Sequence, residues 1–517
     1  MTSMLLCGGR VYAPAGAGPP ATALLVRDGT IAWVGHDGAA GTADVTVDLA
    51  GALVTPAFVD AHVHTTMTGL ALSGLDLAGT ASLAEAVDAV QRQARRSAGR
   101  PVLGTGWDQT RWPERRAPTR QELDRAGYGG LVYLSRVDGH SAVVSSALLA
   151  ATPGVSGLPG FAESGHLAAE AHHAARRIAY ASITPAQRRD AQRATLRRAA
   201  ELGIGCLHEL AGPDISGADD LAALVALAAE EPTPEVVPYW GELDGVAAAR
   251  ELGAAGAAGD LFADGAIGSH TACLSAPYAD APATAGRAYL DAEDVRRHAV
   301  ACTRAGLQAG FHAIGDEAVR TVVAGYAAAA EEVGEPAFAV ARHRVEHLEM
   351  LGPDLVAELA RLGVVASVQP AFDALWGGPD GMYAQRLGRD RALAMNPFAG
   401  LAAAGVPVAF GSDSPVTPLG PWEGVRAAVR HHVPAERLTA GAAFAAHTRG
   451  GWLAARRGGR DGTLAAGAPA TFAVWAAGEL GPDGLPDLAS GAPAPACLRT
   501  VVRGEAIHPR ETSEVDR

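Results

Sequence analysis

The segment Val59-Asp60-Ala61-His62-Val63-His64 follows the apolar run at residues 53–58 and decides how this chain is interpreted. The apolar run predicts a buried strand, along which successive side chains alternate between the two faces. His62 and His64 therefore point the same way at the end of that strand, where both imidazoles could hold one metal ion. Two histidines near a turn are also often merely solvated, so the metal site needs support from the rest of the chain.

Seven further apolar runs follow, most of them preceded by alanine-rich segments of helical length and period. The eight runs lie at residues 53–60, 203–210, 236–243, 260–264, 307–313, 342–348, 364–370 and 408–413. Strands that alternate with helices in this way predict an α/β fold, specifically a (β/α)8 TIM barrel. The gap at residues 66–195 is too long for one crossover. We therefore expect an inserted subdomain there that covers the active site.

The two ends of the chain carry short β-rich runs separated by turns. Asp28-Gly29 lies between two such runs and predicts a hairpin. Each set of strands is too small to be stable alone, so we expect residues 1–52 and 455–517 to pair into one small β-sandwich. Residues 53–454 then form the barrel domain.

Composition limits the classes of function. The net charge is -14 and no local run of basic residues reverses it, which argues against a nucleic-acid or anionic membrane surface. A small-molecule substrate is the remaining expectation, with a homodimer as the general expectation for a soluble enzyme. The sequence has neither a signal-peptide pattern nor a long apolar span, and its five cysteines form no C-x-x-C pair, so we expect a cytoplasmic protein.

Other predicted strands also end in side chains that can bind a metal. His312, His347 and Asp413 end the fifth, sixth and eighth strands, and the fourth offers Asp260 at its start and Asp264 near its end. A TIM barrel brings the carboxyl ends of its strands together at one rim. Neutral imidazoles with a carboxylate suit zinc or a similar divalent metal.

These motifs, in their order along the chain, resemble the amidohydrolase superfamily. They are His-x-His at residues 62–64, FADGAIGS at 262–269, HAIGD at 312–316, RVEH at 344–347 and GSDSP at 411–415. The chain is most similar to the long YtcJ-like branch, which includes N-substituted formamide deformylases. The resemblance implies that the metal ligands are His62, His64, His312, His347 and Asp413, and that the protein hydrolyses an amide-type C–N bond.

The chain departs from the family pattern at one position. Where the family usually has a lysine that bridges two metals once carboxylated, this chain has Asp260, and all 42 basic residues counted as lysine or arginine are arginine. A carboxylated lysine is therefore impossible. Both a one-metal and a two-metal site remain open, and the shorter aspartate slightly favours one ion.

In the expected mechanism, a metal lowers the pKa of a bound water and Asp413 acts as general base and acid. His140 or His347 would stabilise the oxyanion. We expect Trp107, Arg111, His140, Asp264 and His270 to contact the substrate. The other histidines considered are expected at the surface, namely His172, His173, His431 and His432.

Two alternatives remain open. A one-metal barrel of the same superfamily could instead deaminate its substrate or hydrolyse a cyclic amide, and release of ammonia would distinguish deamination. A barrel that has lost its metal could serve as a binding protein. The convergence of so many polar groups in a barrel mouth argues against this last reading, because such groups are costly to bury without a function.

Overall fold

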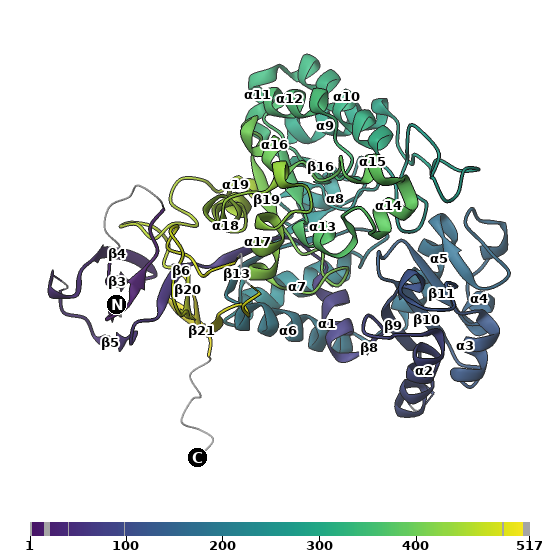
Figure 1. The fold of residues 1–517 in the computed structure, drawn as a ribbon, viewed down its shortest axis with the longest axis horizontal. Coiled ribbons are helices and arrows are strands. Elements are labelled where there is room, and N and C mark those ends of the chain that lie inside the picture. Colours follow the sequence, from purple (N-terminus) through teal and green to yellow (C-terminus); the bar gives the residue numbers. More distant parts are fainter. Residues whose placement is uncertain (1–2, 15–20, 40, 98, 489–490, 510–517) are drawn as a thin grey trace.

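The computed structural model describes residues 3–14, 21–39, 41–97, 99–488 and 491–509. A central barrel separates two β-sheets built from the ends of the chain from a subdomain inserted early in the barrel (Figure 1). Parts of the predicted sandwich segments, at residues 1–2, 15–20, 40, 489–490 and 510–517, lie outside the described residues.

The barrel is a parallel eight-stranded sheet in the order β19-β18-β17-β16-β15-β14-β13-β7. Its strands are β7 (Phe58–Val63), β13 (Ile204–Ala211), β14 (Glu235–Trp240), β15 (Gly256–Ala257), β16 (Gln308–Ala313), β17 (Arg344–His347), β18 (Val365–Val368) and β19 (Val408–Phe410). The sheet nearly closes on itself, because Asp413 N donates to His62 O at 2.8 Å and His64 N donates to Ser414 O at 3.0 Å. The predicted α/β TIM barrel is confirmed.

Two predicted strands differ from the observed ones. The run at 53–60 is split, since β6 (Leu53–Pro56) joins a terminal sheet and β7 begins the barrel. The fourth strand is β15 rather than residues 260–264, so Asp260 lies just beyond the carboxyl end of its strand and not at its start. Gly259 precedes it with φ +113°, a backbone conformation that favours glycine, and a Cβ there would lie 3.1 Å from the Leu210 side chain.

Helices between the barrel strands begin and end at recognisable capping residues. α6 (Pro185–Glu201) starts with a capping box between Thr184 and Gln187, and α9 (Ala292–Ala305) ends at Gly306 in the left-handed conformation. Further helices follow the strands in the chain, including α7 (Ala218–Glu230), α10 (Asp316–Val333), α12 (Pro353–Leu362), α16 (Phe398–Ala403), α17 (Pro421–Val429), α18 (Ala440–Ala446) and α19 (Arg449–Ala454). The buried side chains of these helices, α19 excepted, contribute to one hydrophobic core with the strands, and Trp452 and Ala454 of α19 pack in two smaller clusters.

After α1 (Thr65–Ser73), the inserted segment forms a five-stranded sheet in the order β12-β11-β10-β9-β8. The strands are β8 (Leu75–Asp76), β9 (Val102–Trp107), β10 (Val132–Arg136), β11 (Ser141–Val144) and β12 (His166–Ala168), with helices α2 (Leu83–Ser97), α3 (Arg120–Ala126), α4 (Ser146–Ala151) and α5 (Ala169–Ala181). The insertion has hydrophobic clusters of its own. It therefore packs as a separate layer that sends loops and α5 toward the barrel.

Both chain ends contribute to the terminal sheets. One sheet has the order β4-β3-β1-β5 and contains β1 (Ser3–Cys7), β3 (Ala23–Arg27), β4 (Thr30–Gly35) and β5 (Val45–Asp48). The other has the order β2-β6-β20-β21-β22 and joins β2 (Arg10–Val11) and β6 to β20 (Phe472–Ala476), β21 (Ala496–Val502) and β22 (Glu505–His508). One hydrophobic cluster, with Leu24, Val54 and Phe472 among its members, links the two sheets.

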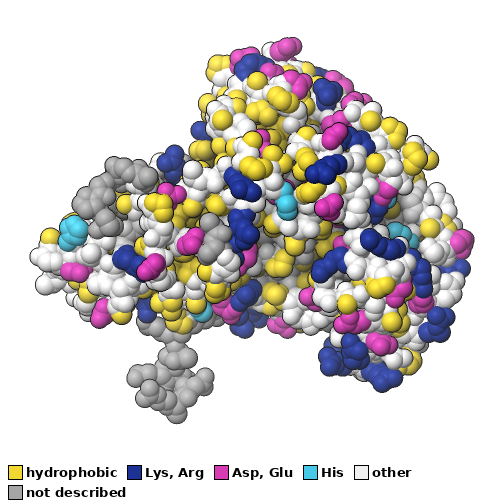
Figure 2. All heavy atoms as spheres, in the orientation of Figure 1, with side chains coloured by type: hydrophobic (Ala, Val, Ile, Leu, Met, Phe, Trp, Pro, Cys, Tyr) yellow, Lys and Arg dark blue, Asp and Glu magenta, His cyan; other side chains and the backbone are white. Residues whose placement is uncertain are grey.

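Basic and acidic side chains are interspersed over the face in Figure 2, apart from a small group of basic side chains over α2. That helix carries Arg92, Arg95 and Arg96. Among the described residues, no helix is long and apolar enough to span a membrane.

Candidate metal centre

Six buried side chains converge at the carboxyl end of the barrel strands. His62 lies in β7 and His64 just after it, His312 and His347 lie in β16 and β17, and two carboxylates from the loops after β15 and β19 complete the cluster. The carboxylates are Asp260 and Asp413, and all six residues are at most 8% exposed. The structure thus brings together every residue that the resemblance implied as a metal ligand, together with Asp260.

The six side chains form two groups that share Asp260. His62, His64, Asp260 and Asp413 make one group, and Asp260, His312 and His347 make the other; within each group the candidate ligand atoms lie within 4.8 Å of one another. Asp260 Oδ2 lies 3.1 Å from His64 Nε2, and Asp260 Oδ1 lies 3.5 Å from His312 Nδ1. One carboxylate can therefore contact both groups.

Each imidazole is oriented by its second nitrogen. His62 Nδ1 lies 3.0 Å from Glu346 Oε2, His64 Nδ1 lies 3.1 Å from Leu210 O, and His347 Nδ1 lies 2.8 Å from Gln369 Oε1. His312 uses its other nitrogen, Nε2, at 3.3 Å from Gly265 O. Because these partners are oxygens that accept, each ring donates outward and leaves its other nitrogen facing the centre as the candidate metal ligand. This is how metal-binding histidines are usually held.

The inward atoms test whether a metal suits the site. Five buried polar atoms at this centre have no hydrogen-bond partner, namely His62 Nε2, His312 Nδ1, His347 Nε2, Asp260 Oδ1 and Asp413 Oδ1. Buried polar atoms without partners are costly and need an explanation. Cations bound in the two groups would give all five atoms a partner, and the nitrogen and carboxylate donors suit zinc. The residues therefore fit the metal that the family implies.

The protonation of the cluster follows from its charges. Burial alone lowers the pKa of His64, but Asp260 and Asp413 outweigh it and raise that pKa to about 9. Burial opposes ionisation of Asp413, yet His62 and His64 hold the pKa of its carboxyl below the ordinary value. The centre therefore attracts positive charge, for which protons and a metal cation compete.

Two of the candidate metal ligands have left-handed backbone. His347 has φ +73° and Asp413 has φ +55°, although neither is glycine. Left-handed backbone at such residues costs of order 1–3 kcal/mol and clusters at functional sites. The backbone at Asp413 is held by its hydrogen bond to His62 O. These conformations turn the side chains of the strand ends toward the centre.

The metal centre borders two cavities that share His173, Asp260 and Phe262. A cavity of about 30 Å³ lies directly at the metal-binding groups, and a second of about 270 Å³ opens beside Asp260. The smaller one is also lined by His140 and Arg176 from the insertion. The His140 ring lies 4.9 Å from the His312 ring, between ring centroids. Burial, and then the charge of His312, hold the pKa of His140 well below its ordinary value, so its imidazole is neutral.

Trp107 and Arg111 do not lie where a substrate contact was expected. The Trp107 indole is 0% exposed, donates to Leu134 O at 2.8 Å and belongs to the core of the insertion, so the prediction for it is corrected to a packing role. Arg111 is exposed, donates to Ala78 O at 3.2 Å and lines neither cavity.

Asp264 and His270 also lie elsewhere. Asp264 is 0% exposed and accepts backbone hydrogen bonds from Ile314, Gly315 and Cys273 at 2.8–3.0 Å, so it organises the loop after β16 instead of contacting a substrate. Burial outweighs these bonds and raises its pKa to about 7. His270 pairs with Asp280 at 3.0 Å and lines neither cavity.

Three of the histidines expected at the surface are not there. His172 and His431 are 0% and 1% exposed, and the former pairs with Tyr133 Oη at 2.8 Å. His173 lines both cavities, and with Arg176 it was missed by the sequence interpretation. The signal was available, because Arg176 follows His173 by three residues in α5, and side chains with that spacing lie on one face of a helix.

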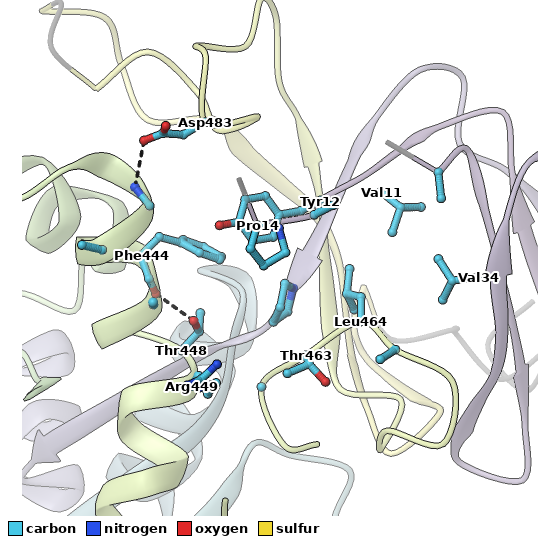
Figure 3. A pocket seen from close by; sticks show the side chains of 18 of the residues that line it. Val11, Tyr12, Pro14, Val34, Phe444, Thr448, Arg449, Thr463, Leu464 and Asp483 are labelled. Carbon is cyan, nitrogen blue, oxygen red and sulfur yellow. Dashed lines mark hydrogen bonds between the residues drawn. The ribbon is translucent and has the colours of Figure 1, made fainter. Parts of the chain in front are cut away.

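A larger cavity of about 740 Å³ lies away from the metal centre, between the N-terminal strands and helix α18 (Figure 3). Tyr12, Phe444 and Leu464 give it an apolar wall, and Asp483 accepts a hydrogen bond from Gly441 N at 3.1 Å. It shares no residue with the two metal-binding groups. We therefore place the chemistry at the strand ends.

Comparisons with known proteins agree with this geometry. The model of the amidohydrolase family matches residues 45–508. The Bacillus subtilis protein YtcJ is 27% identical, over 82% of this chain and 82% of its own. An N-substituted formamide deformylase of Arthrobacter pascens is 26% identical, over 88% of this chain and 90% of its own. The crystal structure of an uncharacterised metal-dependent hydrolase from Pyrococcus furiosus aligns with TM-score 0.70 at 26% identity, over 91% of this chain and 98% of that one.

The barrel and its buried His/Asp cluster define the class of metal-dependent hydrolases. The chain belongs to the amidohydrolase family, in the branch that includes YtcJ and N-substituted formamide deformylases.

Proposed function

We propose that this protein is a zinc-dependent hydrolase that cleaves the C–N bond of an amide or N-substituted formamide. The observation that carries the proposal is the set of five unpartnered buried atoms in the two metal-binding groups. The similarity to a formamide deformylase over most of both chains supports the choice of bond.

We further propose that the centre holds two ions, with Asp260 in place of the family's bridging lysine. Asp260 belongs to both ligand groups, which favours two ions over the single ion that the sequence slightly favoured. Metals bound there would supply a water of lowered pKa and polarise the substrate carbonyl.

The chain's own residues supply the proton transfers. Asp413 is ionised, because His62 and His64 lower the pKa of its carboxyl against the effect of burial. It can therefore accept the proton of the attacking water and pass it to the leaving nitrogen. His140, neutral and at the edge of the cavity, is placed to donate to the carbonyl oxygen as charge develops on it. His347, the other candidate for that role, is oriented inward by Gln369 and is assigned to metal binding.

The first test is the metal content of the purified protein by elemental mass spectrometry, with Asp260→Ala beside it. We expect about two zinc ions per chain, and about one in the variant, because the His62 group keeps three ligands and the His312 group only two. Asp354→Ala, on an aspartate whose side chain is 70% exposed, is the matched control and should keep both ions. One ion per chain, unchanged in Asp260→Ala, would contradict the bridging role.

Assays of the loaded enzyme test the reaction. Hydrolysis of N-substituted formamides should release formate and an amine, and Asp413→Asn should abolish it. Release of ammonia from a ring amine would instead indicate deamination. A protein that binds no metal and takes none up on addition would favour the binding-protein reading.

A further inference from the structure

Arg176 differs from the other deeply buried arginines. Arg136 pairs with Asp138 at 2.6 Å and with Asp108 at 3.1 Å, and Arg344 pairs with Glu346. Arg176 is only 4% exposed but has no carboxylate within 4.0 Å among the described residues. A buried charge without a partner is costly. An anion from outside the chain would remove that cost.

The contacts of Arg176 leave part of its guanidinium free. Its Nη2 donates to His173 Nδ1 at 3.2 Å and to the backbone oxygen of Asp214. Its Nε is buried and has no hydrogen-bond partner. The bond to His173 also fixes that ring, since a nitrogen that accepts from arginine leaves the other nitrogen to carry the proton.

The position of Arg176 sets where an anion would bind. It lines the same cavity of about 30 Å³ as Asp260, His312, His347 and Asp413. A space this small places the anionic group within a few bonds of the carbon that is attacked. The neighbouring cavity of about 270 Å³, which shares His173, leaves room for the rest of a substrate.

We propose that Arg176, assisted by His173, binds a carboxylate of the substrate, so that the preferred substrates are N-acylated or N-formylated amino acids. Guanidinium groups match carboxylates in geometry and charge, and a buried one discriminates strongly against neutral analogues. The inference rests on the proposed amide hydrolysis and specifies its substrate class. It gives the insertion a role in selecting the substrate, in addition to covering the site.

The test uses one matched pair of compounds, N-formylphenylalanine and N-formylphenylalaninamide, which differ in charge but hardly in shape. For the zinc-loaded wild type we expect kcat/KM to be at least about tenfold higher for the carboxylate, the size expected of hydrogen bonds to a charged group. Arg176→Met should remove that preference, mainly by raising KM for the carboxylate. Arg176→Lys should recover part of it.

Two controls separate loss of recognition from loss of structure. Arg125→Met removes an exposed arginine from α3 of the same insertion and should leave the preference unchanged. Metal content should be the same in Arg176→Met as in the wild type, and the melting temperature should not fall, because the variant removes a buried charge that has no partner. If that variant does not fold, the preference of the wild type and the intermediate value of Arg176→Lys decide the question.

Binding is measured separately by calorimetry, because it does not require turnover. Tighter binding of the carboxylate that is lost in Arg176→Met supports the inference even if neither compound is hydrolysed, and the failure would then belong to the proposed reaction alone. A wild type that prefers the neutral amide, or a preference that survives in Arg176→Met, would overturn the inference.

Discussion

Single residues behind the metal ligands fix the geometry of the centre. Glu346 accepts from His62 and also from Arg344, whose guanidinium reaches Ala61 O at 2.7 Å as well. All of these groups are buried. The orientation of one imidazole is thereby tied to an ion pair inside the barrel, so damage to that pair should be felt both in stability and at the metal.

Glu346→Gln should lower the free energy of unfolding at pH 7 by about 3–5 kcal/mol, because Arg344 stays buried without a carboxylate. Urea titration would measure this. Glu335→Gln, at a surface pair with Arg361, is the control and should change stability by less than about 1 kcal/mol. Equal changes in the free energy of unfolding for the two substitutions would show that the buried ion pair stabilises the fold no more than the surface pair does.

The stability contributed by the Arg344–Glu346 pair should depend on pH. Burial alone would raise the pKa of Glu346, but Arg344 and His62 outweigh it and lower the pKa to about 2. A carboxyl whose folded pKa is lowered stabilises the fold above its unfolded value of 4.5, and this contribution is lost as pH falls toward about 2. The stability difference between wild type and Glu346→Gln should therefore shrink below about pH 4.5. A difference that stays constant down to pH 3 would contradict this assignment.

At the scale of elements, the insertion contributes both packing and chemistry. Its sheet and helices bury Trp107, while the loop between β10 and β11 and helix α5 bring His140 and Arg176 to the cavity. Substitutions in the core of the insertion should lower its stability. Substitutions of its residues at the cavity should instead change substrate binding.

Trp107→Phe should lower the stability of the insertion with little change in KM, because the indole packs inside the subdomain. The larger truncation Trp107→Ala should cost about 3–5 kcal/mol. Hydrogen exchange of the strands β9 and β10 would report the local loss. Arg111→Ala should change neither hydrogen exchange nor KM. A raised KM in Trp107→Phe with unchanged hydrogen exchange would contradict the packing role and support the substrate contact predicted from the sequence.

At the scale of the whole molecule, metal binding and folding are coupled, because the ligands come from distant parts of the chain. His62 and Asp413 are 351 positions apart, yet their side chains approach to 3.3 Å. A cation that binds only the folded chain stabilises it. Removal of zinc by a chelator should therefore lower the melting temperature.

The size of that effect should depend on pH. Asp260 and Asp413 raise the pKa of His64 to about 9 against the effect of burial. The protonated ring therefore stabilises the metal-free protein at low pH, and this contribution is lost as pH rises through about 9. Zinc must displace the proton, so its affinity should rise roughly tenfold per pH unit for each proton released. Competition with a chelator at pH 6 and pH 8 would measure the change, and a pH-independent affinity would contradict it.

The sequence by itself determined the barrel and the side chains expected at its rim. It could do so because apolar periodicity and the position of polar residues at strand ends are local properties of the chain. His62, His64, His312, His347 and Asp413 each stand at the end of an apolar run. The α/β alternation then leaves few ways to arrange those runs.

Only the tertiary structure decided what Asp260, Trp107 and Arg176 do. The observed strand ends at Ala257, which places Asp260 between the two metal-binding groups. Trp107 and Arg176 belong to the same insertion, yet one is enclosed in its core and the other borders the metal centre. These outcomes depend on contacts between segments far apart in the chain, because burial and the partners of a charge are set by what packs against a residue and not by its neighbours in sequence.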